Sequence, residues 1–215
     1  MTSAIARLLA AASPPLITAT PVLASPAAPR TDGLFAELAN LLRERNGFFA
    51  FGPALHVFPT EATDWSWGLE GWNDAKLWKH EFQSFVDPGF CFAEDLVGNQ
   101  FCILDDRVQY FAVETGKMEP LASSIEDWAN LILEDDQFWT AWPIAEKWAE
   151  RHGPVPPRRR LHPATPFVCG GTYEIDNLRA VNAAEMMGYW GNFARQIRAL
   201  PDGTQIGLAF GKLPN

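Results

Sequence analysis

The chain has 215 residues, 47% of them hydrophobic, which is ordinary for a globular protein with one substantial core and an appendage. Its formal net charge is −9, and residues 100–150 hold eleven acidic but only three basic side chains. This acidic middle disfavours nucleic acids and anionic membranes as partners, because phosphates would be repelled, and it favours a basic protein partner. The alternative is a solvated acidic face that aids solubility.

Residues 1–31 are rich in Ala and Pro and are expected to form a disordered leader. Pro14 and Pro15 interrupt the apolar run that a secretory signal needs, so a cytoplasmic location is expected, with export by this leader as the alternative. No apolar run approaches the length that spans a bilayer. The three cysteines, Cys91, Cys102 and Cys169, are odd in number and not closely spaced. This predicts no disulfide framework and favours a reducing compartment.

Residues 32–153 are predicted to form an α+β domain. Asp32 precedes apolar residues at helical spacing, and Gly47 is a plausible end for that helix. Strands are expected at 48–51 and 54–58. A turn-like stretch at 64–72, a short helix after Asn73 and a weaker strand at 82–86 follow.

The most informative stretch of the chain is 90–133. Apolar runs at 90–93, 101–104 and 108–113 alternate with compact turns at Asp105-Asp106 and 114–116, and 117–122 adds one more strand. Ser123 lies three residues before Glu126, which predicts a capping box and a helix behind the strands. Further helices are expected from Asp135 or Asp136, and from Pro143 to about His152. Together these elements predict a twisted, mainly antiparallel sheet flanked by helices.

The last third of the chain is expected to extend this domain. Residues 154–166 contain five prolines and three consecutive arginines, which predicts a linker with little regular structure. Residues 167–215 are predicted to form a small α/β subdomain or an extension of the sheet. An extended run is expected at 172–178, a helical stripe at 190–200 and a closing strand at 205–210.

The sequence offers no evident catalytic chemistry. None of the four histidines, His56, His80, His152 and His162, lies at metal-ligand spacing from another His or a Cys, and His56 is expected in the core or at its rim. No nucleophile elbow, phosphate-binding loop or zinc-protease motif is present. The sequence therefore predicts no catalytic residue, no metal and no cofactor.

Adjacent carboxylates are the remaining candidates for function. Most of them lie at turns and helix starts, where an acidic residue satisfies free N–H groups, so a structural role is one interpretation. The other interpretation is an acidic, Trp-bearing surface that binds a protein. The residues predicted for that surface are Asp105, Asp106, Glu134, Asp135, Asp136 and Trp139.

The stretch from Phe90 to about Gly153 resembles the SUKH superfamily, the group named after a yeast regulator of cell-wall synthesis. The resemblance rests on Ala93-Glu94-Asp95 at a strand end, Gly98-Asn99 before the next strand, the Asp105-Asp106 and 114–116 turns, and the Ser-initiated helix with Trp128. The helix predicted after Asp32 fits the family's opening helix. The resemblance implies a single α+β domain without shared catalytic residues, and many bacterial members look like immunity proteins that block a toxin.

Three hypotheses follow. The first is a cytoplasmic immunity-type protein that binds a basic toxin, a nuclease being the natural guess, through its acidic surface. The second is a scaffold or regulator that binds an endogenous protein or peptide. The third is an enzyme with an unrecognised site, which predicts a deep pocket with convergent polar groups and shifted pKa values. The sequence does not indicate an oligomeric state.

Overall fold

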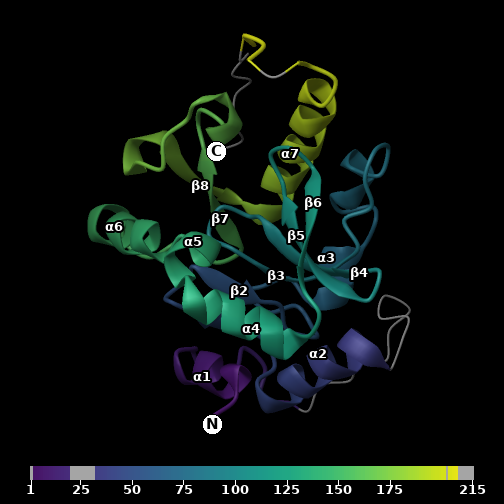
Figure 1. Ribbon diagram of the computed structural model, residues 1–215. Coiled ribbons are helices and arrows are strands. Elements are labelled where there is room, and N and C mark those ends of the chain that lie inside the picture. Colours follow the sequence, from purple (N-terminus) through teal and green to yellow (C-terminus); the bar gives the residue numbers. More distant parts are fainter. Residues whose placement is uncertain (1, 20–31, 202, 208–215) are drawn as a thin grey trace.

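A six-stranded antiparallel sheet forms the centre of the protein. We describe a computed structural model of the chain, covering residues 2–19, 32–201 and 203–207. The strands lie in chain order, which is a simple meander (Figure 1). They are β1 (Phe48–Ala50), β2 (Leu55–Val57), β3 (Phe90–Glu94), β4 (Gln100–Leu104), β5 (Arg107–Ala112) and β6 (Lys117–Ala122). The predicted α+β class with a mainly antiparallel sheet is confirmed.

Helices and a small second sheet surround this centre. The helices are α1 (Ala4–Ala10), α2 (Gly33–Glu44), α3 (Leu69–Asn73), α4 (Ile125–Glu134), α5 (Asp136–Thr140), α6 (Trp142–His152) and α7 (Ala183–Ile197). Short 3-10 turns are η1 (Lys79–Glu81), η2 (Phe167–Cys169) and η3 (Ile175–Asn177), and the second sheet pairs β7 (Arg159–Pro163) with β8 (Leu178–Asn182). Among the described residues, no helix has both the length and the apolarity to cross a membrane.

Both faces of the large sheet are buried. On one face, Phe92 and Phe101 meet the ring of Trp128 from α4 edge-on, at centroid distances of 5.1 and 5.7 Å. On the other face, Phe111 contacts Trp78 and Phe82 from the segment around η1. Successive strand residues point to opposite faces, so the aromatic residues of one meander fill two cores.

The β4–β5 connection is the tight turn that the sequence predicts. Asp105 and Asp106 both have left-handed backbone conformations, with φ of 53° and 55°. Two successive positive φ values define the hairpin turn whose twist matches the flanking strands, and Asp tolerates this region better than most residues.

The expectation of a disordered leader over 1–31 is wrong for residues 2–19. Leu8 of α1 is fully buried, and the Glu126 carboxylate on α4 accepts hydrogen bonds from the backbone N–H groups of Ala4 and Ile5. Arg45 donates to the backbone carbonyl of Leu9 in the last turn of α1 and to those of Ala12 and Ser13 just beyond the helix. The partners of this segment lie far along the chain, so local composition does not reveal them. Residues 20–31 lie outside the described part.

The expectation of an irregular linker at 154–166 is also wrong, because β7 lies inside it. Three of the five prolines precede the strand, Pro163 ends it and Pro166 follows it, so the N–H groups of residues 159–162 remain free to pair. The C-terminal part is no independent unit either, since Met187 and Trp190 of α7 are fully buried in the main core.

The predicted helical stripe is α7, whereas 172–178 contains bends and η3 instead of an extended run, and 205–207 form no strand. Residues 208–210 lie outside the described part.

Two local predictions also need correction. The proposed strand at 82–86 is a turn that continues from η1. The cap of α4 is Ser124, whose Oγ accepts from the Asp127 N–H at 2.9 Å, while Ser123 donates to the Asp127 carboxylate. Glu126 therefore does not form the predicted capping box, and its carboxylate binds the N-terminus of α1 instead.

Candidate functional site

Four of the six predicted partner-binding residues lie together where α4 ends and α5 begins. Glu134 accepts a hydrogen bond from Asn130 Nδ2 at 2.7 Å. Asp135 caps α5, and Asp136 accepts from the indole Nε1 of Trp142 at 2.9 Å. Trp139 is half-buried. The structural interpretation of these carboxylates therefore applies to Asp135, as a helix cap, and to Asp136, as the acceptor for an indole, while Glu134 is exposed at the surface.

An exposed aromatic ring stands beside these carboxylates. Phe138 of α5 is 70% exposed and meets Trp139 edge-on at a centroid distance of 4.8 Å. Trp139 in turn packs edge-on against Tyr110 of β5 at 5.5 Å, which connects the exposed ring to the sheet. A large apolar side chain held on a rigid base and bordered by charges is a common hot-spot arrangement in protein interfaces.

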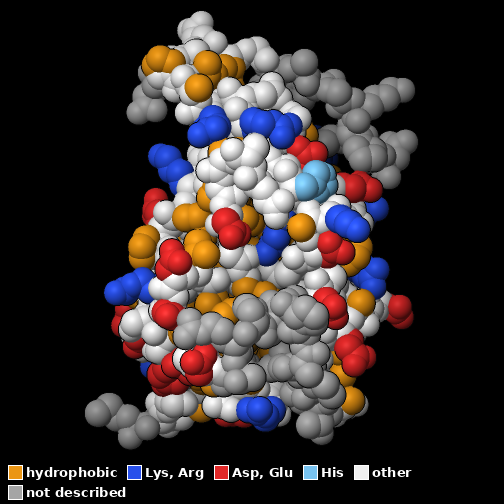
Figure 2. Space-filling model, turned by 90° about the vertical axis from the view of Figure 1, so that its right-hand side faces the viewer, with side chains coloured by type: hydrophobic (Ala, Val, Ile, Leu, Met, Phe, Trp, Pro, Cys, Tyr) orange, Lys and Arg blue, Asp and Glu red, His pale blue; other side chains and the backbone are white. Residues whose placement is uncertain are grey.

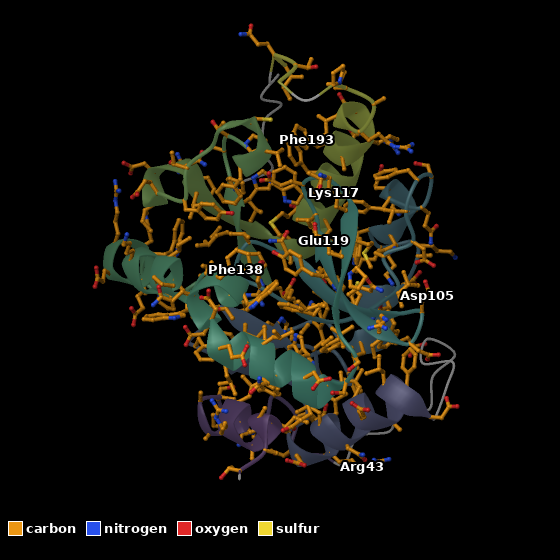
Figure 3. The ribbon with its side chains drawn as sticks, viewed as in Figure 1. Arg43, Asp105, Lys117, Glu119, Phe138 and Phe193 are labelled. Atoms are coloured by element: carbon orange, nitrogen blue, oxygen red, sulfur yellow. The ribbon has the colours of Figure 1, made fainter. Side chains whose placement is uncertain are left out.

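The other two predicted residues, Asp105 and Asp106, lie elsewhere. Figure 3 shows Asp105 near the right edge and Phe138 left of the centre, with strands of the sheet between them in this view. On the side seen in Figure 2, acidic side chains are interspersed with basic and apolar ones. The structure therefore does not bring all six residues into one compact patch.

A buried polar cluster that the sequence did not predict lies on the face of the sheet away from α4. His56 of β2 faces Glu94 of β3 across the strand pair, and His56 Nδ1 is 3.0 Å from Glu94 Oε1. Arg160 of β7 donates through Nε to the same carboxylate oxygen at 2.8 Å. Ser66 Oγ lies 2.8 Å from His56 Nε2. All four residues are at most 3% exposed.

Charge in this cluster is concentrated on Glu94 and Arg160. Burial lowers the pKa of His56 to about 4, more strongly than the hydrogen bond to Glu94 raises it, so the imidazole is neutral at pH 7. Burial raises the pKa of Glu94, but the Arg160 charge and the hydrogen bonds from His56 and Gln100 outweigh it and leave that pKa lowered. With Glu94 ionised, His56 Nδ1–H donates to the carboxylate, and Nε2 is left as an acceptor facing Ser66 Oγ. The single proton of the Ser66 hydroxyl therefore has two acceptors within reach, His56 Nε2 and the Trp67 backbone oxygen.

The neighbouring residues hold Glu94 at the end of β3. Gln100 of β4 donates to Glu94 Oε2 at 3.3 Å and accepts from Trp72 Nε1 at 2.8 Å. Asp95 closes the β3–β4 turn by accepting from the N–H groups of Val97 and Asn99, and burial raises the pKa of Asp95 to about 7. The Ala93-Glu94-Asp95 and Gly98-Asn99 pattern thus builds a turn and supplies one buried carboxylate.

The serine, imidazole and carboxylate have the connectivity of a nucleophilic triad. Three features set this group apart from an open triad. Ser66 is 1% exposed, its Oγ also lies 2.7 Å from the backbone oxygen of Trp67, and Arg160 neutralises the carboxylate. The arrangement can hold a proton between the hydroxyl and the imidazole. It also ties the β7 segment to the sheet.

A cavity of about 240 Å³ adjoins the cluster. Sequence analysis missed both features, because Ser66, His56, Glu94 and Arg160 come from four separate segments. The available signals were a histidine and a glutamate within apolar strand runs, each of which needs a buried partner.

Two cysteines also meet in space. Cys91 and Cys102 face each other across β3 and β4 with their sulfurs 2.8 Å apart, although both are free thiols. Burial raises the pKa of Cys102 well above its usual value, which keeps the thiol protonated and unreactive. The prediction of no close pair overlooked the hairpin that joins them.

No group of three or more His, Cys, Asp or Glu side chains suited to holding a metal occurs within residues 2–19, 32–201 and 203–207. Comparison of the chain with models of known protein families found no matching family. Comparison with curated proteins found no match either.

Proposed function

We propose that this protein is a non-catalytic binding module of the SUKH immunity type, which neutralises a cognate bacterial toxin in the cytoplasm. The observation that carries the proposal is the exposed ring of Phe138, supported by Trp139 and bordered by Glu134 and Asp135. An exposed aromatic ring costs free energy in water, and a partner that covers it recovers that free energy.

The charge of the surroundings indicates the kind of partner. Glu134 and Asp135 border the ring, and the chain as a whole carries a net charge of −9. Such a surface attracts a basic protein during encounter. Nuclease clefts are basic, so a toxin with nuclease activity is the first class to test.

The test uses the product of a toxin-like reading frame beside this gene. Co-expression of the wild-type chain should restore growth of cells that make the toxin, and the purified proteins should bind each other. Phe138→Ala should weaken binding by about 30-fold, corresponding to a loss of about 2 kcal/mol at an interface hot spot. Glu134→Lys should slow association, and it preserves the Asp135 cap of α5 and the Asp136–Trp142 hydrogen bond.

Glu146→Lys, on the exposed surface of α6, is the matched control for charge reversal and should leave binding unchanged. Binding that survives both Phe138→Ala and Glu134→Lys would contradict the proposed surface. If no toxin-like gene lies beside this one, the alternative of a scaffold that binds an endogenous protein is favoured.

A second candidate function is hydrolysis of an acyl ester at Ser66, which the Ser66–His56–Glu94 hydrogen bonds favour. Our primary proposal expects no covalent adduct when the native protein is treated with a fluorophosphonate probe, since Ser66 is buried. Ser66→Ala supplies the control spectrum. A mass increase that disappears in Ser66→Ala would establish a reactive serine and overturn the non-catalytic assignment.

A further inference from the structure

The cavity of about 240 Å³ next to the buried cluster is built from six segments, and none of its lining residues belongs to α5. Its walls come from the β1–β2 hairpin, the Trp65–Trp67 loop, Glu94 of β3, Ala149 near the end of α6, residues 154–160 and Ala183 at the start of α7. The Arg158 guanidinium holds two of these walls together, because it donates twice to the Thr63 backbone oxygen and lies 5.1 Å from the Trp67 ring centroid.

The backbone around Arg158 is arranged for this role. Arg158 has a left-handed conformation with φ of 56°, which is uncommon for a residue with a side chain. Its N–H donates to the Trp65 oxygen at 3.2 Å, and its own carbonyl accepts from the Ala183 N–H at 2.9 Å. Residues in such strained conformations cluster at binding sites, where the surrounding structure holds them.

Two buried donors beside this cavity have no acceptor. Arg160 Nη2 and Trp67 Nε1 are inaccessible to solvent and make no hydrogen bond, although both residues line the cavity. An unsatisfied buried donor costs about 1–3 kcal/mol, and more when it is charged. A group that brings acceptor oxygens would recover this free energy.

The charge of the lining and its shape indicate the class of ligand. Three arginines, Arg158, Arg159 and Arg160, contribute to the lining against one acidic residue, Glu94, which is already bonded to Arg160 Nε. The Arg159 side chain donates to the Ala180 carbonyl, so the cations of Arg158 and Arg160 are the ones that serve the cavity. The remaining lining is mainly aromatic rings, prolines and other apolar groups, and Trp65 is 54% exposed. The site therefore has a positive polar end and an apolar body.

We propose that this cavity binds a small organic anion, an aromatic or acyl carboxylate, with its carboxylate at Arg160 and Trp67 and its apolar part against Trp65 and Phe49. A cavity of roughly 150 Å³ holds a benzene molecule, so the space here suits a ring or a short acyl chain together with its carboxylate. Arginine suits this role because its planar fork of N–H donors matches the two oxygens of a carboxylate.

The experiment is calorimetric titration of the full chain with phenylacetate, 1-naphthylacetate and octanoate, using the corresponding primary amides as uncharged controls. We expect at least one carboxylate to bind with a Kd below about 1 mM and its amide to bind at least tenfold more weakly, a difference of about 1.4 kcal/mol. Trp67→Phe keeps the ring but removes one donor, and it should weaken carboxylate binding several-fold.

A variant that fills the cavity entrance tests binding without removing any residue of the buried cluster. Ala149 is an exposed residue of α6 that lines the cavity, so Ala149→Trp should fill the entrance and abolish binding. Lys147→Trp, on the same helix but outside the lining, should bind as the wild type does. Absence of binding by all three carboxylates, equal affinity for the amides, or binding that survives Ala149→Trp would overturn the proposal. The toxin-binding surface is tested with different residues, so the two proposals can fail separately.

Discussion

His162 of β7 lies flat against Trp190 of α7, with ring centroids 4.6 Å apart and planes within 4°. The residue is 2% exposed, and neither ring nitrogen makes a hydrogen bond of good geometry. Burial lowers the pKa of His162 to about 4, with smaller opposing contributions from the backbone of Pro163 and of His162 itself. Burying the unsatisfied imidazole therefore costs folding free energy, which its stacking on Trp190 offsets.

This geometry predicts that His162→Phe stabilises the fold and changes its pH dependence. The folded pKa lies below the unfolded value of 6.5, so the unfolded state takes up a proton first and the wild type loses stability as pH falls from 6.5 towards 4. The variant removes that loss. Its advantage should be about 1–2 kcal/mol near pH 7 and larger near pH 5.

Urea unfolding of both proteins at the two pH values measures the difference. His80→Phe, which places the same ring on an exposed side chain of η1, is the control and should show no gain. Equal pH dependence in the wild type and in His162→Phe would contradict the prediction.

Among the secondary-structure elements, α1 is held by charge at both ends. The Glu126 carboxylate accepts from N–H groups at its N-terminus, where the helix dipole favours an anion, and Arg45 donates to carbonyls in its last turn and just beyond it. The helix has seven residues, which is too short to be stable alone in water. Its order therefore depends on these contacts and on the burial of Leu8 and Leu9.

Glu126→Ala should release α1 without unfolding the sheet. Removal of charged hydrogen bonds costs about 1.5–3 kcal/mol, which is enough to let a short docked helix detach locally. Amide hydrogen exchange at residues 4–12 should speed up by at least about tenfold, while exchange in β3, β4 and β5 stays as in the wild type. Glu146→Ala on α6 is the matched control. Unchanged protection in α1 would show that apolar burial alone holds it.

The contrast between α1 and the meander shows what the sequence could and could not predict. The strands from Phe90 to Ala122 follow from alternating apolar residues and local turns such as Asp105-Asp106, so their signals lie within a few residues. The docking of α1 depends on Glu126, and the burial of Arg160 depends on Glu94. Both pairs are more than 60 residues apart in the chain. Local composition therefore predicts irregular structure for the α1 and β7 segments, because the residues that order them lie far away in the sequence.

The candidate sites divide in the same way. Asp135, Asp136 and Trp139 are close in the sequence. Their proximity in space follows once a helix is predicted to start at Asp135 or Asp136. The Ser66, His56, Glu94 and Arg160 cluster could not be predicted, because no spacing rule connects a loop, two strands of the meander and a strand beyond α6. The cysteine pair shows an intermediate case, since the β3–β4 register that brings Cys91 to Cys102 was implied by the predicted hairpin.

At the scale of the whole molecule, the Glu94–Arg160 ion pair joins the six-stranded sheet to the β7–β8 sheet. Both side chains are almost completely buried, at 3% and 4% exposure. A buried charge that loses its partner is strongly destabilising, whereas removal of both charges costs much less. We therefore expect Glu94→Gln and Arg160→Met each to lower the free energy of unfolding by about 3–5 kcal/mol, and the double variant to lose clearly less than the sum.

Urea unfolding of the four proteins at neutral pH gives this coupling energy, which should be at least about 2 kcal/mol. The exposed pair Arg151–Asp176 is the matched control, and its double-variant cycle should show no measurable coupling. If the sheet and the C-terminal segment fold as one unit, each protein unfolds in a single transition and the slope with urea stays constant. A second transition in Arg160→Met would instead mean that this ion pair is what makes the two sheets unfold together, because Trp190 and the rest of α7 would then leave the core separately.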